Sequence, residues 1–277
     1  MKKIHEEVFL GNHEQYSHKL DILARMAQPE IWTFRSVKES DPYRILRNYF
    51  QFTYERLAEE HKISTSRDGN WQCMNTGLLT VYDQEIVALF SRNQREEGLP
   101  WYLCGFFRDS DRQFRSVFSD VPPLADYGED ATDLIFDKKL EIRLNKSHII
   151  DDNFSRFVQA GYDGKPLIDA LLEAAHQKLK KKLGRNFKLA LPFYYHNTET
   201  DERKIQLLVP LYFPNAPVRL ALVLDKRNAQ DGMYYEAVTV LPVEWAYMNA
   251  RLIVRPDEEW AKIVDEADVF VPEEEYF

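Results

Sequence analysis

The chain has 277 residues, of which 44% are hydrophobic and 29% are charged, with a mean hydropathy of −0.49. This composition excludes a disordered or fibrous protein. No run approaches the roughly eighteen apolar residues of a membrane span, and the first residues interrupt their apolar stretch with His and Glu too early for a signal peptide. We therefore expect a cytoplasmic protein with no membrane partner, in which Cys73 and Cys104 are free thiols.

The net charge of −9 is unevenly distributed along the chain. Residues 257–277 contain nine acids and one base, so this segment carries −8 and the rest of the chain only −1. Residues 176–188 contain six bases and no acid. This basic segment is either the solvated face of an amphipathic helix or a phosphate-binding surface.

The first half of the chain predicts helices followed by short strands. Helices are expected over 17–27 and 41–62, the second opened by Asp41 and Pro42. Runs rich in β-branched and aromatic residues predict strands within 77–93, turning at Asp83-Gln84, and at 101–107. A further hairpin is expected within 132–145, and a helix over 166–183 that begins at Pro166 and ends at Gly184.

The second half predicts mainly strands, at 187–195, 204–213, 218–226, 234–242 and 249–256. Most connections are too short for crossover helices, which favours antiparallel pairing. The expected fold is α+β, with a large antiparallel or mixed β-sheet and two to three packing helices. We expect a single domain over residues 1–262, followed by an acidic C-terminal tail over 263–277.

The motifs of P-loop NTPases, Rossmann dehydrogenases, zincins and α/β-hydrolases are absent, which leaves three clusters of candidate residues. The first, 145–157, contains His148, Asp151, Asp152, Asn153 and Arg156. Such residues can supply a general base, an orienting carboxylate and a cation for a phosphate. They can equally form a capped turn, and His148 with either Asp could hold a metal.

The second cluster, 183–196, contains Arg185 and Lys188, which can bind an anion, followed by Tyr195 and His196 near the end of a predicted strand. Alternation along that strand would place Phe187 and Lys188 on opposite faces. The third cluster, 245–253, contributes Asn249 and Arg251, which can either clamp a ligand or hydrogen-bond within the sheet.

The chain resembles a bacterial family catalogued as domain of unknown function 3825. The matching motifs follow one another along the chain: M-A-x-P-E-x-W (26–32), I-L-R-N-Y-F-x-F-T-Y-x-R-L-x-E-E-x-K-I (45–63), T-G-L-L-T with E-I-V-A-L-F-x-x-N (76–93), D-L-I-F-D (133–137), H-I-I-D-D-N-x-x-R-F (148–157), R-N-F-K-L-A-L-P (185–192) and W-A-Y-M-N-A-R-L-I (245–253). The resemblance covers about residues 20–262. It implies RNA-linked multidomain architectures with a fused winged-helix module, and it implies no particular activity. We expect no such module within these residues.

Three functional hypotheses follow. The first is RNA or nucleotide binding, with phosphate contacts from Arg156, Arg185, Lys188, Asn249 and Arg251 and support from Asp151, Asp152, Asn153 and Tyr195. The second is a phosphodiester- or nucleotide-processing enzyme that needs no metal, with His148 and His196 as acid and base. The third is a non-catalytic protein whose acidic tail docks a protein partner or shields the basic segment. We expect no cofactor and no metal.

Overall fold

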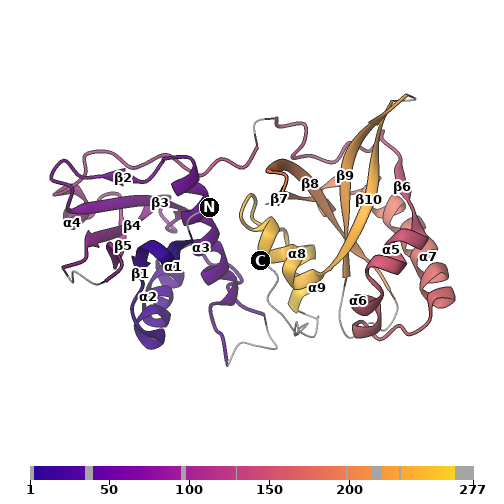
Figure 1. Ribbon diagram of the computed structural model, residues 1–277, viewed down its shortest axis with the longest axis horizontal. Coiled ribbons are helices and arrows are strands. Elements are labelled where there is room, and N and C mark those ends of the chain that lie inside the picture. Colours follow the sequence, from indigo (N-terminus) through magenta and orange to yellow (C-terminus); the bar gives the residue numbers. More distant parts are fainter. Residues whose placement is uncertain are drawn as a thin grey trace. The chain divides into compact units, whose positions relative to one another are not determined.

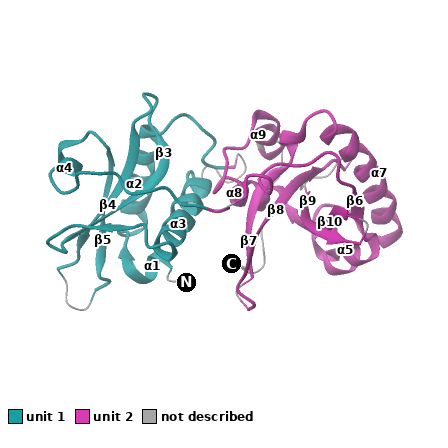
Figure 2. Ribbon diagram, turned by 90° about the horizontal axis from the view of Figure 1, so that it is seen from above, with its two compact units in different colours: residues 1–33, 38–126 teal, residues 34–37, 127–277 magenta. Residues whose placement is uncertain are grey.

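The computed structural model describes residues 3–34, 40–94, 98–128, 130–197, 199–213, 220–230 and 232–265. The chain divides into two compact units (Figure 2). Unit 1 comprises residues 1–33 and 38–126, and unit 2 comprises residues 34–37 and 127–277. Each unit is built around its own β-sheet (Figure 1). A single domain over 1–262 stays a prediction, and nearly all of the expected acidic tail lies outside the described residues.

Unit 1 contains a five-stranded sheet in the order β1-β5-β4-β3-β2. Its neighbouring strands are antiparallel except for the parallel pair of β1 and β5. The strands are β1 (Val8–Phe9), β2 (Ser64–Thr65), β3 (Trp71–Leu79), β4 (Glu85–Arg92) and β5 (Trp101–Arg108). The helices are α1 (Ile4–Glu7), α2 (His13–Met26), α3 (Arg44–Glu59) and α4 (Arg112–Arg115).

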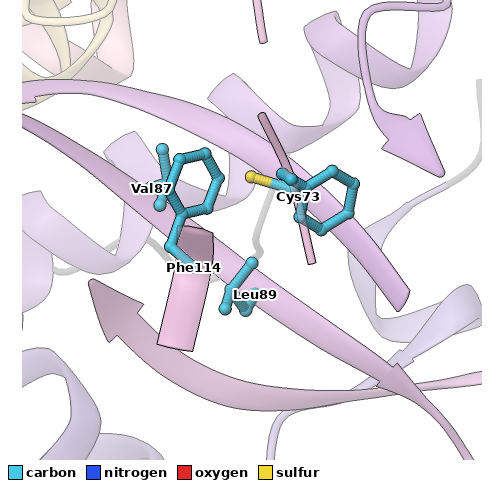
Figure 3. Close-up of a cluster of buried hydrophobic side chains, with 5 residues drawn as sticks. Cys73, Val87, Leu89 and Phe114 are labelled. Carbon is cyan, nitrogen blue, oxygen red and sulfur yellow. The ribbon is translucent and has the colours of Figure 1, made fainter. Parts of the chain in front are cut away.

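Apolar side chains cover both faces of the unit 1 sheet. On one face, Phe50 of α3 packs edge-on against Phe106 of β5, with ring centroids 5.2 Å apart. On the other, the buried side chains of β3 and β4 meet those around α4, as Figure 3 shows for Cys73, Val87, Leu89 and Phe114. The burial follows from the strand period of two, which sends successive apolar residues to opposite faces.

Unit 2 contains a second five-stranded sheet, in the order β6-β10-β9-β8-β7, with β6 parallel to β10 and all other pairs antiparallel. Its strands are β6 (Ile142–Leu144), β7 (Leu191–Asn197), β8 (Glu202–Leu211), β9 (Leu220–Ala229) and β10 (Gly232–Pro242). Its helices are α5 (Lys146–Asp152), α6 (Phe154–Gln159), α7 (Lys165–Leu183), the 3₁₀ helix η2 (Phe187–Leu189), α8 (Val243–Ala250) and α9 (Glu258–Asp265).

One face of the unit 2 sheet is covered by the segment that precedes β6. The ring of Phe136 stacks on Tyr235 of β10 at 4.9 Å, and Asp133 pairs with Lys226 of β9 at 2.8 Å. Helices α5 and α6 both contact β10, and α7 contacts β8 and α5 (Figure 1). Part of the second face is left uncovered by these elements, and it carries the cavity described below.

The α+β class is confirmed, with strands that form two mixed sheets instead of one large sheet. The long helices at 41–62 and 166–183 are confirmed as α3 and α7. The hairpin expected within 132–145 is wrong: only Ile142–Leu144 forms a strand, and it pairs in parallel with β10. The reason is that Phe136 packs on Tyr235 and the Asp137 amide donates to the Tyr235 hydroxyl at 2.9 Å, which lays this segment across the sheet.

Two other strand predictions are also corrected. Residues 187–189 form a 3₁₀ turn, so Phe187 and Lys188 do not alternate across a strand, and β7 begins only at Leu191. The strand expected at 249–256 is wrong, because α8 occupies Val243–Ala250 and turns follow it. Seven of the eight residues of α8 are buried, and a helix that is buried on nearly all sides has no hydrophobic periodicity that separates it from a strand.

Candidate functional site

The first predicted cluster folds as two short helices. Asn145 accepts a hydrogen bond from the His148 amide and so caps the start of α5. His148 lies 3.2 Å from Asp152 one turn later, with both side chains more than half exposed. Asp151 pairs with Lys165 at 2.6 Å, also at the surface. These three predicted residues therefore form ion pairs at a solvated helix turn.

Asn153 and Arg156 join helix α6 to strand β10. Asn153 is 2% exposed, and its side-chain oxygen accepts hydrogen bonds from Arg156 Nη1 at 2.7 Å and from the Thr239 hydroxyl at 2.7 Å. The same Arg156 nitrogen also donates to the Val240 carbonyl. Burial lowers the pKa of Arg156. Because the guanidinium is committed to backbone and side-chain acceptors, this pair connects two elements of the fold.

The second predicted cluster is spread over three elements. Arg185 Nη1 donates to the Lys181 carbonyl at 2.8 Å and closes the last turn of α7, while Lys188 is exposed on η2. Tyr195 and His196 follow each other on β7 and therefore point to opposite faces of the sheet. His196 Nε2 contacts Asp201 at 2.8 Å, at the turn between β7 and β8.

The third predicted cluster lies at the end of α8. The side-chain nitrogen of Asn249 donates to the Trp245 carbonyl one turn earlier, at 2.9 Å. Arg251, in the turn that follows, is only 8% exposed. Asn249 is therefore held by its own helix, and Arg251 is buried in the turn that follows.

The predicted catalytic and phosphate-binding residues lie on different elements of unit 2. His148 belongs to α5, which contacts β10, whereas His196 belongs to β7 at the edge of the sheet opposite β6. The axes of β10 and β7 are about 14 Å apart, three strand spacings, in this order of strands. Of all the predicted site residues, only Tyr195 lines the cavity on the sheet.

That cavity has a volume of about 370 Å³ and spans strands β7 to β10. Register explains why distant residues meet there: Tyr195 lies opposite Lys204, Phe193 opposite Gln206, and Val223 opposite Thr239. Directly opposed residues of antiparallel strands share a face. The lining is Phe193, Tyr195, Glu202, Lys204, Gln206, Val223, Asp225, Arg227, Val238, Thr239 and Leu241.

The charged part of the cavity is organised around Asp225, whose side chain is 3% exposed. Its Oδ2 lies 2.8 Å from Lys204 Nζ and 2.8 Å from Arg227 Nη2. Lys204 also pairs with Glu202 at 2.9 Å, and Arg227 Nε lies 3.3 Å from Glu236. Burial alone would lower the pKa of Lys204, but the hydrogen bonds to Asp225 and Glu202 outweigh it and raise the pKa. Both cations are thus fixed in place by carboxylates, and the raised pKa keeps Lys204 charged at neutral pH.

Next to these charges the cavity offers aromatic and neutral polar groups. The Lys204 ammonium lies 5.5 Å from the centroid of the half-buried Tyr195 ring, and Phe193 lies 6.5 Å from the same ring. Gln206 and Thr239 add an amide and a hydroxyl. This combination suits a ligand with a flat ring, hydrogen-bonding edges and a negative charge. Within the described residues, no three His, Cys, Asp or Glu side chains gather as they would around a metal ion.

Sequence reasoning missed Lys204, Asp225 and Arg227, although a weak signal was present. In strand β8, every second residue from its start is polar: Glu202, Lys204 and Gln206, which alternate with Arg203, Ile205 and Leu207. Asp225 closes an otherwise apolar run, LALVL. A polar period of two in one strand and a lone acid in its neighbour indicate a shared polar face, but only the strand register brings the groups together.

The fold and cavity define an α+β protein with a charged, aromatic-lined pocket on a mixed sheet. The chain belongs to the family described as Domain of unknown function (DUF3825), whose family model matches residues 23–260. No curated protein and no solved structure matches the chain. Among the helices that the structure describes, none is both long and apolar enough to span a membrane.

Proposed function

We propose that the chain binds a nucleotide unit, either free or within single-stranded RNA, in the cavity on the sheet of unit 2. The observation that carries the proposal is the half-buried Tyr195 ring beside Lys204, in a cavity that Arg227 also lines. Every base offers a flat face to an aromatic ring, and stacking of this kind contributes about 1–3 kcal/mol per base. The volume of about 370 Å³ is at the small end of ligand pockets, as a single nucleotide requires.

Of the two cations, the more exposed one, Arg227, would contact the phosphate. Arg227 is 44% exposed, and its contacts to Asp225 and Glu236 leave further N–H groups for an anion. Lys204 is more enclosed, at 22%, and is shared between two carboxylates. Gln206 and Thr239 can hydrogen-bond to a base edge. The charge-balanced lining makes phosphate attraction modest, so ring stacking supplies most of the affinity.

The test is titration of the full chain with a labelled twelve-nucleotide single-stranded RNA and, separately, with adenosine and cytidine monophosphates, at several salt concentrations. Tyr195→Leu removes the aromatic face and should weaken binding about tenfold. Arg227→Ala should reduce the slope of log affinity against log salt by about 0.7, the value for one lost phosphate contact to a single strand. Binding of the monophosphates alone would identify a free nucleotide as the ligand.

Matched controls lie in unit 1. Tyr82, 83% exposed in the turn between β3 and β4, and Arg112, exposed on α4, offer the same residue types away from the cavity. Tyr82→Leu and Arg112→Ala should bind as the unmodified chain does. If Tyr195→Leu is as tight a binder as Tyr82→Leu, or if RNA binding is insensitive to salt, the cavity is not the nucleotide site.

A further inference from the structure

The carboxylate of Glu259, on helix α9, is bound by three side chains of unit 2, which together form an anion site. Lys182 Nζ lies 2.8 Å from it, the Tyr212 hydroxyl donates to it at 3.2 Å, and the side chain of Asn186 hydrogen-bonds to it. These groups come from α7, from the residue following β8 and from the turn after α7. The hydrogen bond from Lys182 is the main reason that the pKa of Glu259 is lowered.

The anion site continues into a basic surface. The Lys182 and Lys178 ammonium groups lie 4.2 and 5.2 Å from the centroid of the Tyr212 ring. The same end of α7 and the residues after it carry Lys180, Lys181, Arg185 and Lys188. Cations at a helix C-terminus stabilise the helix, which accounts for their position. Helix stabilisation does not explain why the Tyr212 hydroxyl and the Asn186 side chain both hydrogen-bond to the same carboxylate. Nor does it explain why this region carries more positive charge than one carboxylate neutralises.

Helix α9 is held by contacts that do not involve the Glu259 carboxylate. Trp260 is fully buried, and its indole N–H donates to the Leu189 carbonyl at 2.9 Å. Asp257 accepts from the backbone amides of Glu259 and Trp260 at 3.1 Å each and so caps the helix. Trp260 and Asp257 therefore fix the helix, and the Glu259 side chain can leave the anion site without undocking it.

We infer that the end of α7 is a second, phosphate-contacting surface for single-stranded RNA, and that Glu259 occupies its central site as a built-in competitor. Lysine, tyrosine and asparagine side chains are among the groups that contact nucleic-acid phosphates. Several cations near the end of one helix fit a strand with repeating phosphates better than a lone anion. Because Trp260 and Asp257 hold helix α9 in place, the Glu259 carboxylate stays next to this site at every RNA concentration. This inference is independent of the cavity on the sheet.

The decisive comparison uses two variants of the full chain that change the same charge on neighbouring residues. Glu259→Gln removes the carboxylate from the anion site, whereas Glu258→Gln removes one from an exposed residue of the same helix. Both are titrated with a labelled twelve-nucleotide oligouridine at several salt concentrations. Glu259→Gln should bind at least about fivefold tighter at low salt, with a salt slope steeper by about 0.7 for the Lys182 contact that it opens. Glu258→Gln should bind as the unmodified chain does.

A double variant and a second ligand complete the test. Adding Lys182→Ala to Glu259→Gln should return both the affinity and the salt slope to those of the unmodified chain. Equal effects of Glu259→Gln and Glu258→Gln would overturn the inference, because only the general field of the segment would then act. Tighter binding of polyglutamate than of oligouridine to Glu259→Gln would overturn it in favour of an acidic protein ligand.

The two proposals can fail separately. Tyr195→Leu weakens binding at the cavity whether or not Glu259 is present, whereas Lys182→Ala matters only once the carboxylate is gone. If the unmodified chain binds neither RNA nor the nucleoside monophosphates but Glu259→Gln binds RNA, the cavity proposal fails and this inference stands. Fluorescence of the buried Trp260, compared with Trp260→Phe, checks that α9 stays docked in each variant.

Discussion

The two units have similar sheet topologies but differ in the side chains that cover the sheet faces. Each has five strands, with one short parallel strand at an edge and antiparallel pairing elsewhere. In unit 1, aromatic and aliphatic side chains fill both faces, so that Phe90 and Leu89, neighbours on β4, are both fully buried. In unit 2, the apolar filling of β8 and β9 stops at Leu207 and Leu224, and charged residues take over towards one end of the strands.

The difference shows that a site can arise where the packing of a sheet ends, with no change in its topology. Once helices and loops no longer cover a sheet face, side chains there must either be polar or be left as an apolar patch. Unit 2 places a buried acid there and balances it with two cations. Substitutions in unit 1 should therefore cost stability through lost packing, and those around Asp225 through unbalanced charge.

The largest expected effect is the loss of packing in unit 1. Leu89 is fully buried in the cluster between β4 and α4 (Figure 3). Leu89→Ala should lower the free energy of unfolding by about 3 kcal/mol, because it removes three buried carbons and leaves a cavity. Urea denaturation measures this loss. Tyr82→Ala, at an 83% exposed position of the same unit, should change it by no more than about 0.5 kcal/mol.

A loss below about 1 kcal/mol for Leu89→Ala would mean that the cluster collapses around the gap. Unit 1 would then be packed less tightly than its burial indicates, and the contrast between the units would weaken.

A smaller loss is expected from the charged cluster of unit 2. Asp225→Ala leaves Lys204 and Arg227 without the acid that they share. Breaking a buried ion pair costs about 3–5 kcal/mol, but Arg227 and Lys204 are 44% and 22% exposed, so water compensates in part and we expect about 2 kcal/mol. Urea denaturation again measures the loss, and the pKa of Lys204 should fall in the same variant.

Asp225→Asn is the matched control for this cluster, since it keeps the shape and one acceptor but removes the charge. It should lose less stability than Asp225→Ala. Equal losses for the two variants would show that the charge of Asp225, rather than its hydrogen bonds, holds the cations.

Local signals in the sequence were enough for most elements but not for the site. Helix α7 is marked by Pro166 in its first turn and Gly184 after its end, and both marks are local. Helix α8 carries no such mark, because nearly every side chain of it is buried. The division of the strands between two sheets, and the wrong hairpin at 132–145, depend on partners far along the chain, such as Tyr235 for Phe136.

The candidate site depends on such distant partners throughout. Lys204 and Asp225 are 21 residues apart and meet only because β8 and β9 pair in one register. Residue types alone led to His148, Arg156 and Arg251, where polar groups are dense in the sequence. In the structure, Asn153 and Arg156 instead hold α6 to β10. Segments dense in polar residues therefore turned out to be capped turns and links between elements. The cavity is instead lined by polar residues that stand singly within apolar strands.

The smallest expected effect concerns how the two units respond to pH. In unit 2, burial and the nearby Lys180 lower the pKa of His176. The unfolded chain, with a pKa near 6.5, then binds the proton more readily than the folded one, so stability is lost as the pH falls below about 6.5. In unit 1, burial raises the pKa of Glu55 above its ordinary 4.5, despite hydrogen bonds from Gln51 and Ile4. Here the folded state binds the proton more readily, and stability is lost as the pH rises through the folded pKa.

Acidification from pH 7 should therefore weaken unit 2 and strengthen unit 1 at these two positions. Hydrogen exchange of backbone amides in α7 and α3, followed between pH 7 and pH 4 and corrected for intrinsic exchange rates, resolves the units separately. His176→Gln should flatten the pH dependence in α7 alone, and Glu55→Gln in α3 alone, because neither replacement titrates. His148→Gln, at an exposed position of unit 2, should leave both unchanged. A pH dependence of α7 that survives His176→Gln would assign the acid sensitivity of unit 2 to other groups. Glu173 of α7, whose pKa is lowered by hydrogen bonds from Gln177 and Lys146, is the next to test.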